Sequence, residues 1–119
     1  MAIRPIILFL CALGAAVPAW SAPSALIIRG SGGDEDYRRL FDGWESRLRK
    51  ALSEQLDFES SRIFVCTENA DAPTSQSLPA RIEHIRQAFD RLAAAHPPEA
   101  DLYVFLFGHG SYLRGVTRF

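Results

Sequence analysis

Three short apolar segments alternate with two long amphipathic segments from residue 25 onward. Residues 25–29 (Ala-Leu-Ile-Ile-Arg) and 62–67 (Arg-Ile-Phe-Val-Cys-Thr) have the length and composition of strands. The third segment, residues 102–107, is six apolar residues without a polar interruption. Such a run, rich in aromatic and β-branched residues, is typical of a strand buried on both faces of a parallel sheet. The pattern therefore predicts three strands.

Between these strands, apolar side chains recur every three or four residues, which is the spacing of one helix face. Asp34 and Glu35 are well placed to start the first helix. Pro79 stands near the start of the second helix, where its missing N–H is harmless. The first predicted stripe comprises Tyr37, Leu40, Phe41, Trp44, Leu48 and Leu52, and the second comprises Ile82, Ile85, Phe89 and Leu92 and ends at His96-Pro97-Pro98.

The predicted order is β-α-β-α-β, which indicates an α/β three-layer sandwich with a parallel, doubly wound sheet. The segments 68–78 and 112–119 show no pattern of a further element. Three strands make a thin sheet, and an edge strand as apolar as residues 102–107 would invite aggregation. We therefore expect a neighbouring strand beside it, from residues beyond Phe119 or from another chain. The domain is expected to be incomplete on its C-terminal side.

The first 21 residues have the layout of a secretory signal peptide. Arg4 gives a positive start, residues 6–17 an apolar core too short to span a bilayer, and Ala19-Trp20-Ser21 a cleavage signal. The alternative is an uncleaved N-terminal anchor. Cleavage would leave residues 22–119 as an exported, periplasmic or secreted domain without a stable membrane anchor.

Charge and cysteine content narrow the possible partners. The 13 basic and 14 acidic residues are interleaved, which argues against a nucleic-acid partner. Cleavage would remove Cys11 and leave Cys66 without a disulfide partner. Cys66 follows apolar Phe64 and Val65, which favours a buried core residue over a reactive thiol. No residues have the spacing of a metal site, and no cofactor is expected.

The strongest candidate for chemistry is His109, which directly follows the third strand between Gly108 and Gly110. Ligands and catalysis collect at the carboxyl ends of parallel strands. A histidine can take a proton from a nucleophile, and the backbone N–H of Gly110 could stabilise an oxyanion. The alternative is an ordinary turn with an exposed histidine.

Residues 30–33 (Gly-Ser-Gly-Gly) lie at the same edge, because they follow the first strand and precede a helix. They match neither a P-loop nor the full dinucleotide fingerprint. Gly30 is a candidate wall of a substrate pocket, and the Arg29 guanidinium could bind a substrate carboxylate. The alternatives are a plain tight turn and a structural arginine.

Residues 105–111 (Phe-Leu-Phe-Gly-His-Gly-Ser) resemble the histidine motif of caspase-like cysteine peptidases, most closely the legumain-like branch and its exported bacterial relatives. Residues 30–37 and Phe41 resemble the turn and helix start after the first strand of those relatives. The likeness covers about residues 24–112. It implies that His109 is the catalytic base, that Gly110 is an oxyanion-hole donor, and that the substrate is a peptide or protein.

The family's cysteine nucleophile belongs after a fourth strand, and nothing in this chain matches it. The tail also departs from the family, because Tyr112-Leu113-Arg114-Gly115 stands where relatives tend to have Asp-Gly. The first hypothesis is therefore an exported caspase-like peptidase whose present chain is inactive alone. The second is a non-catalytic relative that serves as a binding or scaffold module. The third is an α/β-hydrolase fragment, although the Gly-x-Ser-x-Gly elbow is missing.

Overall fold

The computed structural model describes residues 22–118, apart from 69, 71–73 and 96–97. The expected signal peptide lies outside the described residues. The strands are β1 (Ser24–Arg29), β2 (Ile63–Thr67), β3 (Ser77–Pro79), β4 (Leu102–Phe107), β5 (Ser111–Leu113) and β6 (Val116–Arg118). The helices are α1 (Glu35–Gln55), α2 (Ile82–Ala95) and a short 3-10 turn, Ser60–Arg62.

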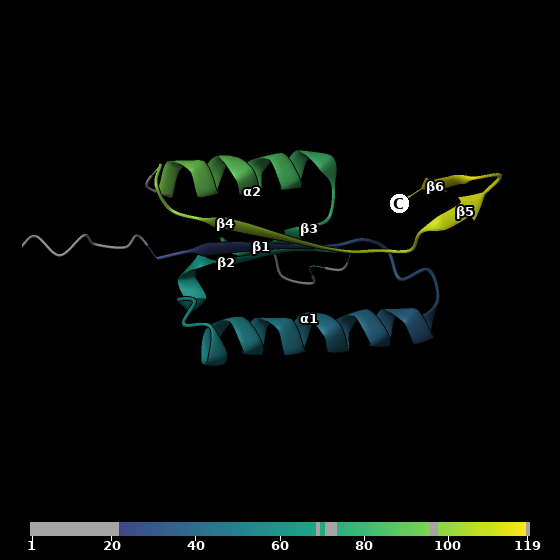
Figure 1. The fold of residues 1–119 in the computed structure, drawn as a ribbon, viewed down its shortest axis with the longest axis horizontal. Coiled ribbons are helices and arrows are strands. Elements are labelled where there is room, and N and C mark those ends of the chain that lie inside the picture. The colour runs from purple at the N-terminus through teal and green to yellow at the C-terminus, as the bar shows by residue number, and fades with distance from the viewer. Residues whose placement is uncertain (1–21, 69, 71–73, 96–97, 119) are drawn as a thin grey trace, which may run out of the picture.

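Four strands form one parallel sheet in the order β3-β2-β1-β4. Helix α1 lies on one face of this sheet and α2 on the other (Figure 1). The fold is therefore a three-layer α/β sandwich with a parallel sheet, as predicted. Because β1 is central, the loop that follows it lies between the carboxyl ends of β2 and β4.

The side chains of β1 alternate between two apolar cores, one under each helix. The core facing α1 contains Ala25, Ile27, Leu52, Phe58, Ile63 and Val65. The core facing α2 contains Leu26, Cys66, Leu78, Ala88 and Leu92. The central strand is thus covered on both sides, which holds its carboxyl end firmly.

The start of the second helix was predicted wrongly. Pro79 ends β3, a short strand that pairs with β2, and α2 begins only at Ile82. Proline is tolerated there because β3 is an edge strand of the sheet. The predicted apolar stripe is also wrong in part, since Ile82 and Phe89 are exposed while Ala88 and Leu92 fill the core.

The third predicted strand is present as β4, but it is not buried on both faces. It lies at the edge of the sheet, and Leu102, Tyr103, Val104 and Leu106 are all exposed. Leu106 reaches 73% exposure. Among the described residues, β4 has a strand on one side only, and α2 covers β1, β2 and β3 instead.

The tail, which was predicted to lack an element, forms an antiparallel hairpin of β5 and β6. Leu113 pairs with Val116, so Arg114 and Gly115 are its two turn residues. Both have a positive φ, 50° and 80°, as the tightest hairpin turns require. The hairpin extends past the carboxyl end of the sheet, beyond the segment that carries His109 (Figure 1).

Candidate functional site

The loop after β1 forms the floor of the candidate site, and its glycines allow a close approach. The Gly30 N–H donates to the Phe107 carbonyl at 2.9 Å, which ties this loop to the end of β4. A side chain on Gly32 would collide with Arg38, because its Cβ would lie 2.8 Å from the Arg38 backbone nitrogen. Asp34 then caps α1 by accepting from the Tyr37 N–H at 2.9 Å.

His109 follows β4 and contacts this loop directly. Its Nε2 lies 2.7 Å from the Gly32 carbonyl oxygen. A carbonyl oxygen can only accept a hydrogen bond, so Nε2 must carry the proton. In the neutral imidazole, Nδ1 is then the nitrogen with the free electron pair. The contact thus selects the tautomer in which Nδ1 can take a proton.

Two aromatic side chains of α1 hold the imidazole from the side. Tyr37 meets His109 edge to face with ring centres 4.3 Å apart, and Phe41 lies at 5.3 Å. Phe41 is buried, so it links His109 to the interior of the domain. From the sequence, Tyr37 and Phe41 were assigned to an apolar helix stripe and to the family-like helix start, but not to a contact with His109. Their contact with His109 follows from the pairing of β1 with β4, which helical spacing does not reveal.

Glu68, which directly follows β2, binds the same loop from the opposite side. Its Oε1 accepts from the Ser31 hydroxyl at 2.5 Å, and its Oε2 accepts from the Gly32 N–H at 2.9 Å. These two hydrogen bonds lower the pKa of the Glu68 carboxyl. Glu68 was not predictable as a site residue, because one acidic residue in a polar loop carries no recognisable signal.

An open, largely apolar cavity of about 690 Å³ lies beside His109. Its lining comes from the ends of β1 and β4 and from the segments that follow them, namely Ile28, Gly30, Ser31, Leu106, Phe107, Gly108 and His109. Gly30 therefore lines the same cavity as the candidate base. Whether it contacts substrate stays a prediction, as does the role of the Gly110 N–H.

Arg29 lies in a different environment from the one its predicted role requires. Its side chain is buried and forms ion pairs with Asp42 and Glu45 of α1. Burial raises the pKa of Glu45, and the positive charges of Arg29 and Arg49 partly oppose that rise. This arrangement favours the alternative of a structural arginine, and substrate binding by Arg29 stays a prediction.

Cys66 is not brought to His109. It lies on β2, whose neighbour β1 separates it from β4, and strands are spaced about 4.8 Å apart. The thiol is fully buried, and burial raises its pKa. The burial makes Cys66 a core residue, as its apolar neighbours predict, and the raised pKa disfavours the reactive thiolate.

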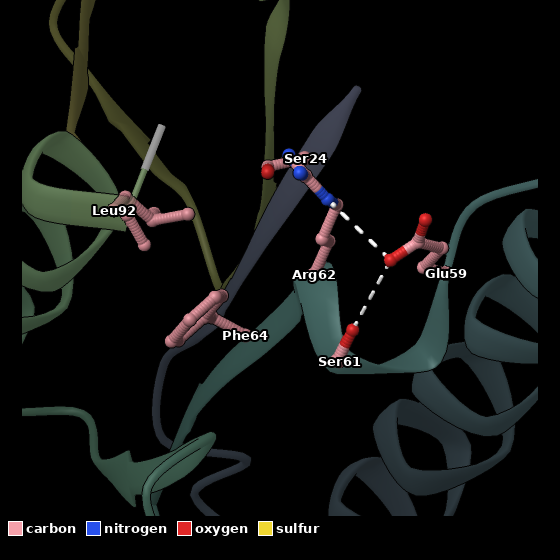
Figure 2. Close-up of a pocket in the computed structure, with 7 residues that line it drawn as sticks. Ser24, Glu59, Ser61, Arg62, Phe64 and Leu92 are labelled. Carbon is pink, nitrogen blue, oxygen red and sulfur yellow. Dashed lines mark hydrogen bonds and ion pairs between the residues drawn. The ribbon is translucent and has the colours of Figure 1, made fainter. Parts of the chain in front are cut away.

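A smaller cavity of about 240 Å³ lies at the opposite, amino end of the strands (Figure 2). Its charged groups are already paired. The Arg62 guanidinium contacts Glu59 at 3.6 Å and donates to the Ala22 carbonyl at 3.0 Å, while Ser61 donates to Glu59. The cavity beside His109 is therefore the better candidate for chemistry.

The fold is therefore that of an α/β protein with a cavity, lined in part by His109, at the carboxyl end of its parallel sheet. No known protein family matches the chain, and neither a curated protein nor a solved structure matches it. In the described part of the chain, no group of three or more His, Cys, Asp or Glu side chains is arranged to hold a metal. None of the described helices has the length and apolar composition needed to cross a bilayer.

Proposed function

We propose that the chain is the base-carrying part of an exported, caspase-like cysteine peptidase of the legumain-like type. The single observation that carries the proposal is the contact between His109 Nε2 and the Gly32 carbonyl. It lies at the carboxyl edge of a parallel sheet, beside an open cavity, and leaves Nδ1 as the accepting nitrogen. Residues 105–111 supply the family resemblance.

The thiol must come from outside the described residues, because Cys66 is buried two strands away from β4. The exposed edge of β4 suits a further strand, since its apolar side chains are uncovered and a strand there would end next to His109. A cysteine at the end of that strand would enter the cavity between Leu106 and His109. The strand would belong to a segment beyond Phe119 or to another chain.

In the proposed reaction, His109 Nδ1 takes the thiol proton and the sulfur attacks the substrate carbonyl carbon. The carbonyl electron pair moves to oxygen, where the Gly110 N–H donates to the developing oxyanion. Collapse of this intermediate breaks the C–N bond, and the imidazolium returns its proton to the leaving amine. Water, deprotonated by His109, then releases the acyl group and restores the thiol.

The test uses the native protein or complex that contains this chain, recovered without denaturant from the exported fraction of cells that encode it, so that any strand paired with β4 is retained. Residues 22–119 alone are expected to be inactive, because Cys66 is buried. Fluorescently labelled casein serves as a general protein substrate. We expect cleavage that iodoacetamide abolishes and that His109→Ala lowers by about 10²-fold or more. His84→Ala, a change on α2 at a partly buried histidine, is the matched control and should leave cleavage unchanged.

Cleavage that survives His109→Ala would overturn the proposal. A native complex that contains the folded wild-type chain and cleaves nothing would also overturn it and would favour the second candidate, a non-catalytic binding module with the same fold. That candidate is favoured by one observation, the absence of an accessible thiol beside His109 among the described residues.

A further inference from the structure

The loop after β1 is contacted by His109, which follows β4, and by Glu68, which follows β2. On the β4 side, the Gly32 carbonyl accepts from His109 Nε2. On the β2 side, the Gly32 N–H donates to Glu68 Oε2 at 2.9 Å. The same glycine thus makes one contact with the residue after β2 and one with the segment after β4. This arrangement follows from the central position of β1 in the sheet.

Glu68 also fixes the residue before Gly32. The Ser31 hydroxyl donates to Glu68 Oε1 at 2.5 Å and accepts from the Gly33 N–H at 3.2 Å. One carboxylate therefore orders Ser31 and Gly32 directly and Gly33 through the hydroxyl. Without it, a loop containing three glycines would regain conformational freedom, because glycine loses more freedom on folding than any other residue.

We propose that Glu68 is a positioning residue for His109, which it reaches through Ser31 and Gly32. The carboxylate holds the loop so that the Gly32 carbonyl faces the imidazole and keeps the proton on Nε2. Its importance for catalysis rests on the proposed function, whereas its effect on the imidazole does not. Glu68 itself is exposed, and its removal leaves both apolar cores untouched.

The test reads the imidazole directly and needs no peptide cleavage. The full chain is labelled with ¹⁵N, and long-range ¹H–¹⁵N spectra are recorded where His109 is neutral, with His109→Gln used for assignment. These spectra report which ring nitrogen carries the proton. Nuclear Overhauser contacts between the rings of His109 and Tyr37 report the position of the imidazole, whose centre lies 4.3 Å from that of Tyr37.

In Glu68→Ala we expect the ring-nitrogen signals of His109 to shift towards a mixture of tautomers and the contacts with Tyr37 to weaken. Glu68→Gln should shift them less, because its amide oxygen can still accept from the Gly32 N–H. Glu83→Ala, which removes an exposed glutamate from α2, is the matched control and should shift nothing.

Unchanged His109 signals in a folded Glu68→Ala variant would overturn the inference, and so would equal shifts in Glu68→Ala and Glu83→Ala. Should Glu68→Ala fail to fold, Ser31→Ala removes one of the two hydrogen bonds, and unchanged His109 signals there would equally overturn it. The readout of this test is the His109 imidazole and not peptide cleavage. Failure of this inference is therefore distinct from failure of the proposed peptidase.

Discussion

Replacing Gly32 with alanine tests how tightly the loop after β1 is packed against α1. An alanine Cβ would lie 2.8 Å from the Arg38 nitrogen and 2.9 Å from the Arg38 Cα. Ordinary contacts between such atoms begin near 3.5 Å, so the loop or the helix start must move by about 0.7 Å. Because both atoms belong to the backbone, no side-chain rotation can relieve the clash.

We expect Gly32→Ala to lower the free energy of unfolding by about 1–3 kcal/mol, the usual cost of overpacking. The matched control is Gly108→Ala, because a Cβ there would meet nothing within 4 Å. Both changes restrict the unfolded chain equally, which alone would stabilise by about 0.4–1 kcal/mol. The difference between the two variants therefore isolates the clash.

The assay is urea unfolding of both variants, followed by circular dichroism. We expect a lower midpoint with an unchanged slope for Gly32→Ala, and an unchanged or higher midpoint for Gly108→Ala. In a domain of this size each kcal/mol corresponds to about 4–8 °C in melting temperature. Equal midpoints for the two variants would refute the claim that Gly32 packs against the start of α1.

Three further predictions test the surroundings of the site. Cys66 should react with iodoacetamide only as the domain opens, because the buried thiol has a raised pKa; rapid reaction in folded protein would contradict this. Arg29→Met should cost about 2–3 kcal/mol of stability and raise the pKa of Glu45 further, whereas Arg47→Met, a change on α1, the helix that carries Glu45, should have little effect in parallel melts. Glu68→Gln should be less stable than wild type above pH 4.5, and urea titrations across pH should show this difference shrinking as the pH falls below that value. The reason is that a lowered folded-state pKa stabilises only while the carboxylate stays ionised; a constant difference would argue against its hydrogen bonds.

Periodicity predicted the two helices and three of the sheet strands because each segment is long enough to show its pattern. It missed β3, since three residues ending in proline resemble a loop, and the strand exists only through its pairing with β2. It missed the β5–β6 hairpin for a related reason: Arg114-Gly115 is a weaker turn signal than Asn-Gly, and each flanking strand has three residues.

The candidate site was only partly predictable, because the sequence indicates where a residue lies along the chain but not which residues meet in the fold. The position of His109 after an apolar strand was enough to bring it to the loop at residues 30–33. The partners of the imidazole were not predictable, because Gly32, Tyr37 and His109 meet only once β1 pairs with β4. The apolar run of β4 was misjudged as buried, since hydrophobicity indicates a need for cover without showing what provides it.

The most direct test of the central claim is the protonation of His109 in the folded wild-type chain. A long-range ¹H–¹⁵N spectrum of the neutral imidazole distinguishes the two tautomers. The contact with the Gly32 carbonyl predicts a proton on Nε2 alone and a free electron pair on Nδ1. A proton on Nδ1, or the tautomer mixture of an unrestrained histidine, would contradict the account.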